Sequence, residues 1–375
     1  MSIQPFKLER YYARHEFNAR YMFSSSDCES LSLQELLGMA SPASITLWQN
    51  LGLGYTESQG NPLLREEIAH GQTGIGPKNV LIASPEEAIF VAMQTILRPG
   101  DRVVAIAPAY QSLHEIARSI GCEVSNWEMQ PGSQGWQLNM DRLEELLSGK
   151  VRLLVINFPH NPTGFLPSRA QFDQIVALAR AKNVMIFSDE MYRMLELNPA
   201  ERLPSISEVY EQGLGLSGMS KSFSLPGLRI GWLTSQSEGL IRDIVGYKDY
   251  TTICNSAPSE LLALIGLQNR ERIVARNLEI IRANITAATG FFEKYRNLVE
   301  WQPPQAGSIA FPRWLGPGSA EDLCEASVTQ QGVMIVPGSM FDQPGERFRV
   351  GLGRRNFPQA LEHLDEFFSI TYSGV

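Results

Sequence analysis

The chain has 375 residues, of which 43% are hydrophobic and 19% charged, a composition typical of globular proteins and unlike that of disordered ones. Its formal charge is −8 and it has no basic run, which argues against nucleic acid or an anionic membrane as a partner. No uncharged apolar stretch reaches about 18 residues, and four scattered cysteines indicate reduced thiols and a cytoplasmic protein.

The first two thirds of the chain alternate short apolar runs with amphipathic stretches. Strands are expected at 79–84, 101–108, 122–129, 152–159, 184–190, 213–218 and 228–235. Helices are expected at 85–97, 111–120, 140–147 and 168–182. Apolar strands separated by helices predict an α/β fold, with a mostly parallel sheet covered by helices on both faces.

Residues that start and stop helices support this pattern. Asn61 precedes Pro62, which places a capping side chain before a proline at the first helical position. Ser84 precedes another proline, and Glu87 follows three residues later, so a capping box is expected. Gly121 lies just past a predicted helix end.

After about residue 258 the pattern changes. A long helix is expected at 259–295, short strands near 308–312, 333–336 and 348–352, and a final helix near 357–368. We therefore predict a large domain at 46–257 and a smaller α+β domain made of 1–45 and 258–375. The first 45 residues either complete the small domain or lie across the large one.

Polar side chains follow several of the predicted strands. In a parallel sheet, ligands bind outside the carboxyl ends of the strands. The residues that would gather there are Tyr110, Asn161, Asp189, Tyr192, Lys221 and Arg229. A lysine amine forms a Schiff base with an aldehyde, a buried carboxylate holds a pyridine nitrogen protonated, and an arginine fork matches a phosphate. The set suits a phosphorylated pyridine aldehyde.

Three segments carry a family resemblance: PHNPTG at 159–164, SDEMY at 188–192 and SKSFSLPGLRIGW at 220–232. In this order they resemble the signature segments of the class I/II aminotransferases, which are fold-type I pyridoxal-phosphate enzymes. YTESQG at 55–60 and FRVGLG at 348–353 resemble two further segments of the family. The resemblance covers roughly residues 50–355 and implies pyridoxal 5′-phosphate as the cofactor.

The resemblance implies a role for each matching residue around the cofactor ring. Lys221 would form the Schiff base and move the proton between the substrate Cα and the cofactor. Asp189 would pair with the pyridine nitrogen, and Asn161 and Tyr192 would hydrogen-bond the ring hydroxyl. Tyr110 would stack on the ring.

The resemblance also implies which residues bind the cofactor phosphate and which bind the substrate. Arg229 would bind the phosphate, together with the start of the helix after Ser84, including Pro85 and Glu86, and with Ser220. Tyr55 would reach the phosphate from the other subunit of a homodimer. Arg349, with Asn161, would bind the substrate α-carboxylate.

The phosphate site departs from the family pattern in two places. Gly218 stands where a serine or threonine usually supplies a hydroxyl, so Ser217 or Ser220 would replace it unless the contact is absent. Pro85 lacks an N–H, and the two glutamates that follow it are unfavourable beside a phosphate. We expect Glu87 to turn back into its capping box and Glu86 to face solvent.

The leading functional hypothesis is amino-group transfer from an L-amino acid to a 2-oxo acid. Residues 24–37 and the lysine segment resemble a subgroup that includes capreomycidine synthase-like proteins. A cyclase, lyase or decarboxylase with the same cofactor is therefore the first alternative, and a non-catalytic pyridoxal-phosphate-binding protein is the second. Candidates for contacting a polar or acidic substrate side chain are Arg14, His15, Arg20 and Arg355.

Two other kinds of site are not expected. Residues 213–218 match G-x-G-x-x-G, but the glycines fall inside an apolar run rather than between a strand and a helix, so we interpret the match as chance. The five histidines lie far apart, and no Cys/His pair has the spacing of metal ligands, so no metal site is predicted.

Overall fold

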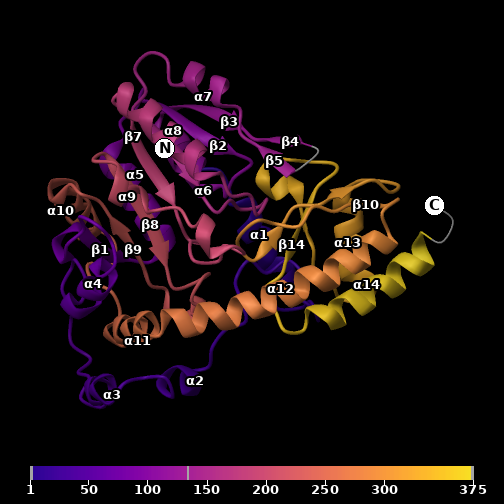
Figure 1. The fold of residues 1–375 in the computed structure, drawn as a ribbon, viewed down its shortest axis with the longest axis horizontal. Coiled ribbons are helices and arrows are strands. Elements are labelled where there is room, and N and C mark those ends of the chain that lie inside the picture. Colours follow the sequence, from indigo (N-terminus) through magenta and orange to yellow (C-terminus); the bar gives the residue numbers. More distant parts are fainter. Residues whose placement is uncertain (1–2, 133–134, 373–375) are drawn as a thin grey trace.

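The computed structural model describes residues 3–132 and 135–372 (Figure 1). Its centre is a seven-stranded sheet. The strands are β1 (Val80–Ala83), β2 (Arg102–Ala107), β3 (Glu123–Glu128), β6 (Leu153–Asn157), β7 (Met185–Asp189), β8 (Gly213–Gly218) and β9 (Gly231–Thr234). They lie in the order β1-β9-β8-β7-β6-β2-β3. Strand β9 is antiparallel to both neighbours and the other pairs are parallel, so the predicted α/β fold is confirmed.

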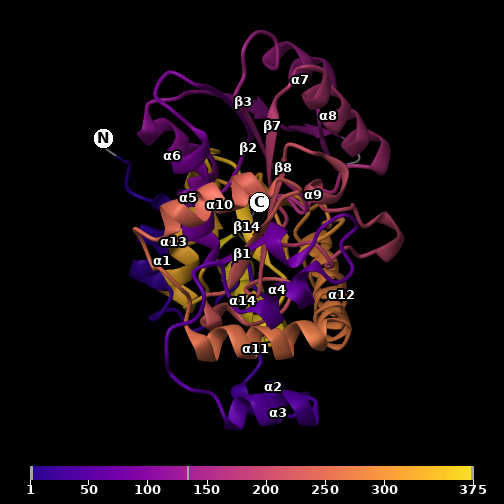
Figure 2. The same ribbon diagram turned by 90° about the vertical axis from the view of Figure 1, so that its left-hand side faces the viewer.

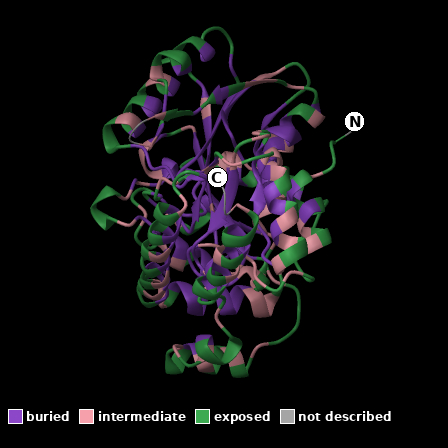
Figure 3. Ribbon diagram, turned by 90° about the vertical axis from the view of Figure 1, so that its right-hand side faces the viewer, coloured by how far each residue is buried: buried purple, intermediate pink, exposed green. Residues whose placement is uncertain are grey.

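The sheet is buried on both faces except at its edge strand β3, where most residues are exposed or half-buried (Figure 3). Val103 and Ala105 of β2 join one apolar cluster, whereas Val104 and Ile106 join the other. This alternation follows from the two-residue period of a strand. Several helices pack into each cluster, and four of them flank the strands of the central sheet. They are α5 (Pro85–Ile96) and α6 (Ser112–Ile120) on one face, and α7 (Met140–Leu146) and α8 (Arg169–Ala181) on the other.

The helix starts agree with the sequence at one site and differ at another. Asn61 accepts hydrogen bonds from two backbone N–H groups at the start of α4 (Pro62–Ala69), as predicted. Ser84 begins α5, but its side chain makes no capping bond. Glu87 accepts hydrogen bonds from the hydroxyls of Thr251 and Thr252 instead. The predicted capping box was therefore wrong, because hydroxyls distant in sequence compete for the carboxylate.

The predicted long helix is divided in two. Helices α11 (Ala257–Gln268) and α12 (Arg270–Lys294) follow one another along one side of the molecule, with a break at Asn269 (Figure 1). A three-stranded antiparallel sheet follows, in the order β11-β14-β13. Its strands are β11 (Ile309–Ala310), β14 (Phe348–Gly351) and β13 (Val336–Pro337), and the last helix is α14 (Phe357–Thr371).

The N-terminal residues associate with the C-terminal strands. Their helices are α1 (Lys7–His15), α2 (Leu33–Leu37) and α3 (Pro42–Gln49). The N–H of Met334 donates to the Tyr21 carbonyl, and the N–H of Gly351 donates to the Phe23 carbonyl. Helices α2 and α3 lie beside α11, away from the sheet (Figures 1 and 2). These pairings agree with an N-terminus that completes the C-terminal part, while the exact division into domains stays a prediction.

The remaining elements surround this frame. They are α9 (Ile206–Val209), α10 (Glu238–Lys248), α13 (Ala320–Gln331), β4 (Gln130–Gly132), β5 (Gly135–Gln137), β10 (Val299–Glu300), β12 (Arg313–Trp314) and the 3₁₀ helices η1 (Pro77–Asn79), η2 (Pro199–Glu201), η3 (Pro226–Leu228) and η4 (Gly338–Phe341). The pairs β4–β5 and β10–β12 were not predicted. Every helix in the described residues is too short or too polar to cross a membrane.

Candidate active site

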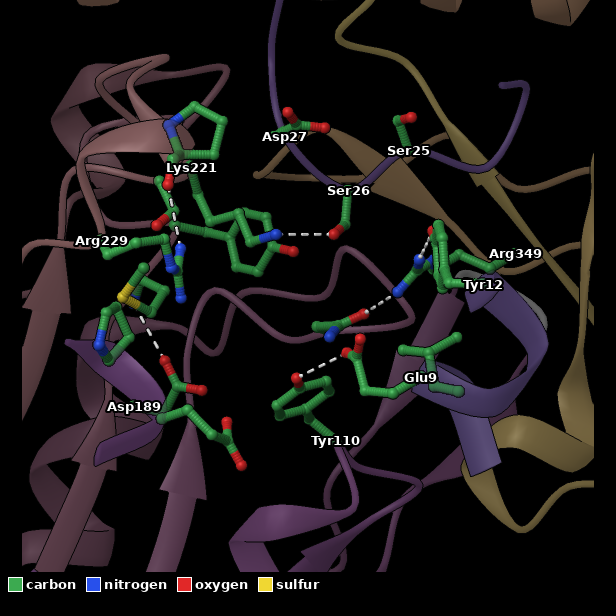
Figure 4. A pocket seen from close by; sticks show the side chains of 18 of the residues that line it. Glu9, Tyr12, Ser25, Ser26, Asp27, Tyr110, Asp189, Lys221, Arg229 and Arg349 are labelled. Atoms are coloured by element: carbon green, nitrogen blue, oxygen red, sulfur yellow. Dashed lines mark hydrogen bonds between the residues drawn. The ribbon is translucent and has the colours of Figure 1, made fainter. Parts of the chain in front are cut away.

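A cavity of about 510 Å³ lies at the carboxyl ends of β6, β7 and β8 (Figure 4). Ten of the twelve predicted site residues line it. They are Pro85, Glu86, Tyr110, Asn161, Asp189, Tyr192, Ser220, Lys221, Arg229 and Arg349. The other two, Ser84 and Tyr55, do not line it. The parallel sheet therefore brings segments that are far apart in sequence to one place, as the strand-end argument predicts.

Asn157, the last residue of β6, joins the ends of β6 and β7. Its amide donates to the Asp189 carbonyl at 2.9 Å, and its side-chain oxygen accepts the Asn161 N–H at 2.8 Å. The Asp189 carboxylate accepts the N–H of Met191 at 3.1 Å. Burial raises the pKa of the Asp189 carboxyl to about 6, and this hydrogen bond only partly offsets the effect. The carboxylate would therefore be stabilised by a cation in the cavity.

The Lys221 loop is tied to the loop after β7 and to α12. The Ser222 hydroxyl donates to the carbonyls of Met191 and Arg193, and the Asn277 amide donates to the Ser222 carbonyl. These bonds fix Ser222, the residue that follows Lys221, to the loop after β7 and to α12. Burial lowers the pKa of the Lys221 amine, which favours the neutral form that a nucleophile or a base requires.

Arg229 enters the cavity from a backbone with φ of 53°, in the left-handed region. Pro85 and Glu86, the first residues of α5, also line the cavity, and the N-terminus of a helix is a favourable place for an anion. Glu86 lines the cavity, so the expectation that it faces solvent was wrong. Burial raises the pKa of the Glu86 carboxyl to about 7, and a hydrogen bond from Ser112 offsets this only in part.

The structure explains the glycine at position 218. A Cβ there would lie 3.0 Å from the Gly231 Cα and 3.1 Å from the Ile230 carbonyl oxygen, because β8 and β9 approach closely. A serine at this position would have to push the two strands apart. Ser220 lines the cavity, whereas Ser217 lines a different one, so Ser220 is the better placed hydroxyl.

Arg349, on β14, is 1% exposed and reaches the cavity from the C-terminal part. Its guanidinium donates to the Asn161 side-chain oxygen at 3.3 Å, to the Tyr12 hydroxyl at 2.7 Å and to the Ser24 carbonyl at 3.0 Å. Within the described residues its Nε has no hydrogen-bond partner. A buried guanidinium with a free N–H and no carboxylate bonded to it is suited to bind the carboxylate of a ligand.

The two tyrosines expected at the cofactor have different positions. Tyr110 lines the cavity, and its hydroxyl donates to Glu9 at 3.2 Å. Tyr55 is 95% exposed and lies outside the cavity of its own chain. An exposed tyrosine of this kind is compatible with a role in a second subunit, and that role stays a prediction.

The sequence did not reveal the residues that the N-terminal region contributes. They are Leu8, Glu9, Tyr12, Glu16, Ser25, Ser26, Asp27 and Ser30, joined by Arg354 from beyond β14. The four proposed side-chain candidates, Arg14, His15, Arg20 and Arg355, do not line the cavity. One local signal was present. Gly351 and Gly353 alternate at and beyond the end of a strand, and such glycines can mark a close approach of another backbone.

The comparisons with known proteins agree with this geometry. Residues 42–364 match the model of the family "Aminotransferase class I and II". The chain belongs to this family. It is 29% identical over 349 residues to capreomycidine synthase of Streptomyces vinaceus, with 92% of this chain and 88% of that protein covered.

Two solved structures are also similar. A PLP-dependent aminotransferase from Streptococcus suis has a TM-score of 0.92 at 29% identity, with 99% of both chains covered. The PLP-dependent cyclase OrfR has a TM-score of 0.91 at 26% identity, with 99% of this chain and 98% of that chain covered. The predicted family and cofactor are confirmed: the chain is a pyridoxal-phosphate-dependent enzyme.

The cavity fits pyridoxal 5′-phosphate. Within the described residues, the buried hydroxyl of Tyr192 has no hydrogen-bond partner, and a buried polar group usually has one. Asp189 faces the same cavity with a carboxylate that no cationic side chain hydrogen-bonds in the described chain. The ring hydroxyl of the cofactor would give Tyr192 a hydrogen-bond partner. The protonated ring nitrogen would give Asp189 a cation.

Proposed function

We propose that the protein is an aminotransferase that moves the amino group of an L-amino acid to a 2-oxo acid. The observation that carries the proposal is the convergence of the Lys221 amine, the Asp189 carboxylate and the Arg349 guanidinium on one cavity. When bound, pyridoxal phosphate supplies an aldehyde that receives the amino group and a protonated ring that withdraws electrons from the substrate Cα.

Each residue at the ring has one task in this proposal. Lys221 Nζ holds the cofactor and accepts the proton that leaves the substrate Cα. Asp189 keeps a proton on the ring nitrogen by offering it a negative charge in a buried site. Asn161 and Tyr192 hydrogen-bond the ring hydroxyl, and Tyr110 stacks on the ring.

The phosphate and the substrate bind at opposite ends of the cavity. Arg229 and the Ser220 hydroxyl bind the phosphate, with the N-terminus of α5 at Ser84, Pro85 and Glu86. At the other end, the Arg349 fork binds the α-carboxylate shared by amino acids and 2-oxo acids, helped by Asn161. One arginine would thus bind both substrates of the exchange, which is what alternate transfer requires.

The enzyme is also proposed to be a cytoplasmic homodimer in which Tyr55 reaches the phosphate of the partner's cofactor. Exposed apolar side chains near Tyr55 in sequence and at the end of α10 support an interface: Leu53 is 84% exposed and Tyr250 is 92% exposed. The four cysteines are free thiols, in keeping with a reducing compartment.

A complementation assay tests the shared site. The Lys221→Ala chain has lost its own site, whereas the Tyr55→Ala chain damages its partner's site. In a mixed dimer both defects fall on one site and the other is intact. Refolding the two variants together should therefore give more activity than either alone. No gain, in dimers shown to be mixed, would mean that Tyr55 acts within its own chain or only packs.

A second candidate is a cyclase, lyase or decarboxylase that uses the same cofactor. The similarity to capreomycidine synthase and to the cyclase OrfR favours it. The cofactor is the same in both cases, and the reaction depends on which Cα bond the cavity aligns for cleavage.

A donor screen separates the candidates. The purified enzyme is incubated with each L-amino acid and a 2-oxo acid acceptor, and both products are quantified along with the cofactor absorbance. Transamination gives one new amino acid for each new 2-oxo acid. Release of ammonia or CO₂, or a ring-closed product without a new 2-oxo acid, would replace the proposal by the second candidate.

A further inference from the structure

The Lys221 amine donates a hydrogen bond to the Ser26 hydroxyl, with 2.8 Å between Nζ and Oγ. The two residues are 195 positions apart, and Ser26 precedes residues 42–364, which match the family. Neither the lysine motif nor the family match therefore accounts for this contact. In Figure 4 the two side chains point toward each other from different segments of the chain.

The backbone around Ser26 lies against β14 and the residues after it, where only glycine fits. A Cβ on Gly351 would lie 1.9 Å from the Ser25 carbonyl oxygen, and one on Gly353 would lie 2.5 Å from the Asp27 carbonyl oxygen. Such distances are far shorter than a van der Waals contact of about 3.5 Å. Because Gly351 and Gly353 have no side chains, the backbone of Ser25 and Asp27 can lie directly against them.

Hydrogen bonds hold the segment in this place. The Ser308 hydroxyl donates to the Ser26 carbonyl at 2.8 Å. The Arg354 guanidinium contacts both carboxylate oxygens of Asp27 at 2.9 Å. The Ser26 carbonyl and the neighbouring Asp27 side chain thus fix the backbone of this segment. The Ser26 hydroxyl can therefore bind the lysine amine without a further loss of backbone entropy.

We propose that Ser26 is a positioning residue for Lys221: its hydroxyl accepts one N–H of the free amine and thereby turns the lone pair of the neutral amine into the cavity. The proposal rests on the proposed function only in that Lys221 moves the proton at the substrate Cα. Ser26 does not itself touch that proton.

The physical reason is the flexibility of lysine. Its amine sits on a four-carbon stem, and a general base is effective only when its lone pair is aimed at the proton. Within the described residues, the Ser26 hydroxyl is the one hydrogen-bond partner recorded for Lys221 Nζ. Burial lowers the pKa of the amine, and the nearby carboxylates of Asp27 and Asp189 oppose this effect. A hydroxyl that accepts a hydrogen bond from the amine acts in the same direction as these carboxylates, because it favours the ammonium form.

Three variants test the role in the holoenzyme. Ser26→Ala removes the acceptor, Ser26→Thr keeps it, and Ser25→Ala removes a neighbouring hydroxyl for which the described residues offer no hydrogen bond. We expect Ser26→Ala to lower both kcat and the exchange of the substrate α-proton with D₂O by about tenfold. Cofactor content and KM should change less than about twofold, and Ser26→Thr should restore the rates.

A second readout does not depend on the reaction. In cofactor-stripped protein, the pH dependence of Lys221 methylation by formaldehyde and cyanoborohydride, followed by peptide mass spectrometry, gives the pKa of the amine. Ser26→Ala should lower this pKa by about one unit, since a charge-assisted hydrogen bond is lost. Ser26→Thr and Ser25→Ala should leave it unchanged.

Several results would overturn the proposal. These are an unchanged exchange rate and lysine pKa in Ser26→Ala, equal losses in Ser25→Ala, or no recovery in Ser26→Thr. Failure of the proposed function gives a different result. In that case the wild-type enzyme forms no 2-oxo acid, while the titration of Lys221 still shows whether Ser26 holds the amine.

Discussion

The cavity has two walls of different origin. The sheet wall consists of residues at or after the carboxyl ends of β6, β7 and β8: Asn161, Asp189, Tyr192, Ser220, Lys221 and Arg229. The N-terminal wall includes Glu9, Tyr12, Glu16, Ser26 and Asp27, together with Arg349 and Arg354 from the C-terminal part. The sheet wall lies inside the matched residues 42–364, whereas the N-terminal residues lie before them.

The difference suggests a division of work. The sheet wall contains the groups that we propose to hold and activate the cofactor, and these belong to short motifs. The N-terminal wall lies on the side of Arg349, where we propose that the substrate carboxylate binds, and its carboxylates and tyrosine belong to no motif. If this division is right, changes in the sheet wall should lower kcat, and changes in the N-terminal wall should act mainly on KM or on the aim of Lys221.

The largest effect is expected at the centre of the sheet wall. Lys221→Ala removes the reacting amine, so activity should fall by at least about a thousandfold. Borohydride should no longer fix the cofactor to the chain, as peptide mass spectrometry can show. Lys182→Ala, an exposed lysine after α8, serves as the control and should behave like the wild type. Finding the reduced cofactor on another lysine would contradict the assignment.

The next largest effect is expected at the buried carboxylate of Asp189. Asp189→Asn nearly keeps the size of the side chain but removes its charge, so the ring nitrogen loses the partner that keeps it protonated. We expect kcat to fall by about 10²–10³, because charge develops in the ring as the Cα proton leaves. Single-turnover α-proton exchange measures this step directly. Near-normal exchange would place the essential carboxylate elsewhere.

Arg349 tests the side of the cavity where the substrate binds. Arg349→Lys keeps the charge but loses the fork, so kcat/KM for amino acids should fall by about 10- to 100-fold, mostly through KM. An amine that lacks the carboxylate should lose little. Equal losses for both substrates would mean that Arg349 supports the fold of the site rather than binding the carboxylate.

Tyr12 should have a smaller effect of the same kind. Its hydroxyl accepts a hydrogen bond from Arg349 at 2.7 Å, so Tyr12→Phe leaves the guanidinium less well fixed. We expect a rise in KM of about three- to tenfold with kcat nearly unchanged. A fall in kcat without a change in KM would break the proposed division between the two walls.

The smallest effect concerns pH. The pKa of Glu86 is raised to about 7 by burial, so this carboxyl gains its negative charge as the pH rises through neutrality. A negative charge near the phosphate should weaken cofactor binding severalfold between pH 6 and pH 8.5. Glu86→Gln should remove that dependence. Glu87→Gln is the matched control, since Glu87 bonds to Thr251 and Thr252 and does not line this cavity.

Much of the sheet wall could be predicted from the sequence because its information is local. An apolar strand ends, a polar residue follows, and the parallel sheet places every such residue at one edge. Asp189 and Lys221 were found in this way, and the structure places both in the cavity. The helix caps were predicted less well, since Glu87 is bound by hydroxyls from residues more than 160 positions away.

The sequence by itself determined the α/β pattern, the family and the residues that follow the strands. Only the tertiary structure decided that Ser26 meets Lys221, that Tyr12 holds Arg349 and that Glu86 faces the cavity. The physical reason is distance along the chain. A periodic pattern reports which face of an element is buried, but it does not report which distant segment lies against it. The position of Ser26 depends on two glycines, Gly351 and Gly353, which are more than 300 residues away. Their effect becomes apparent only when the two backbones are packed together.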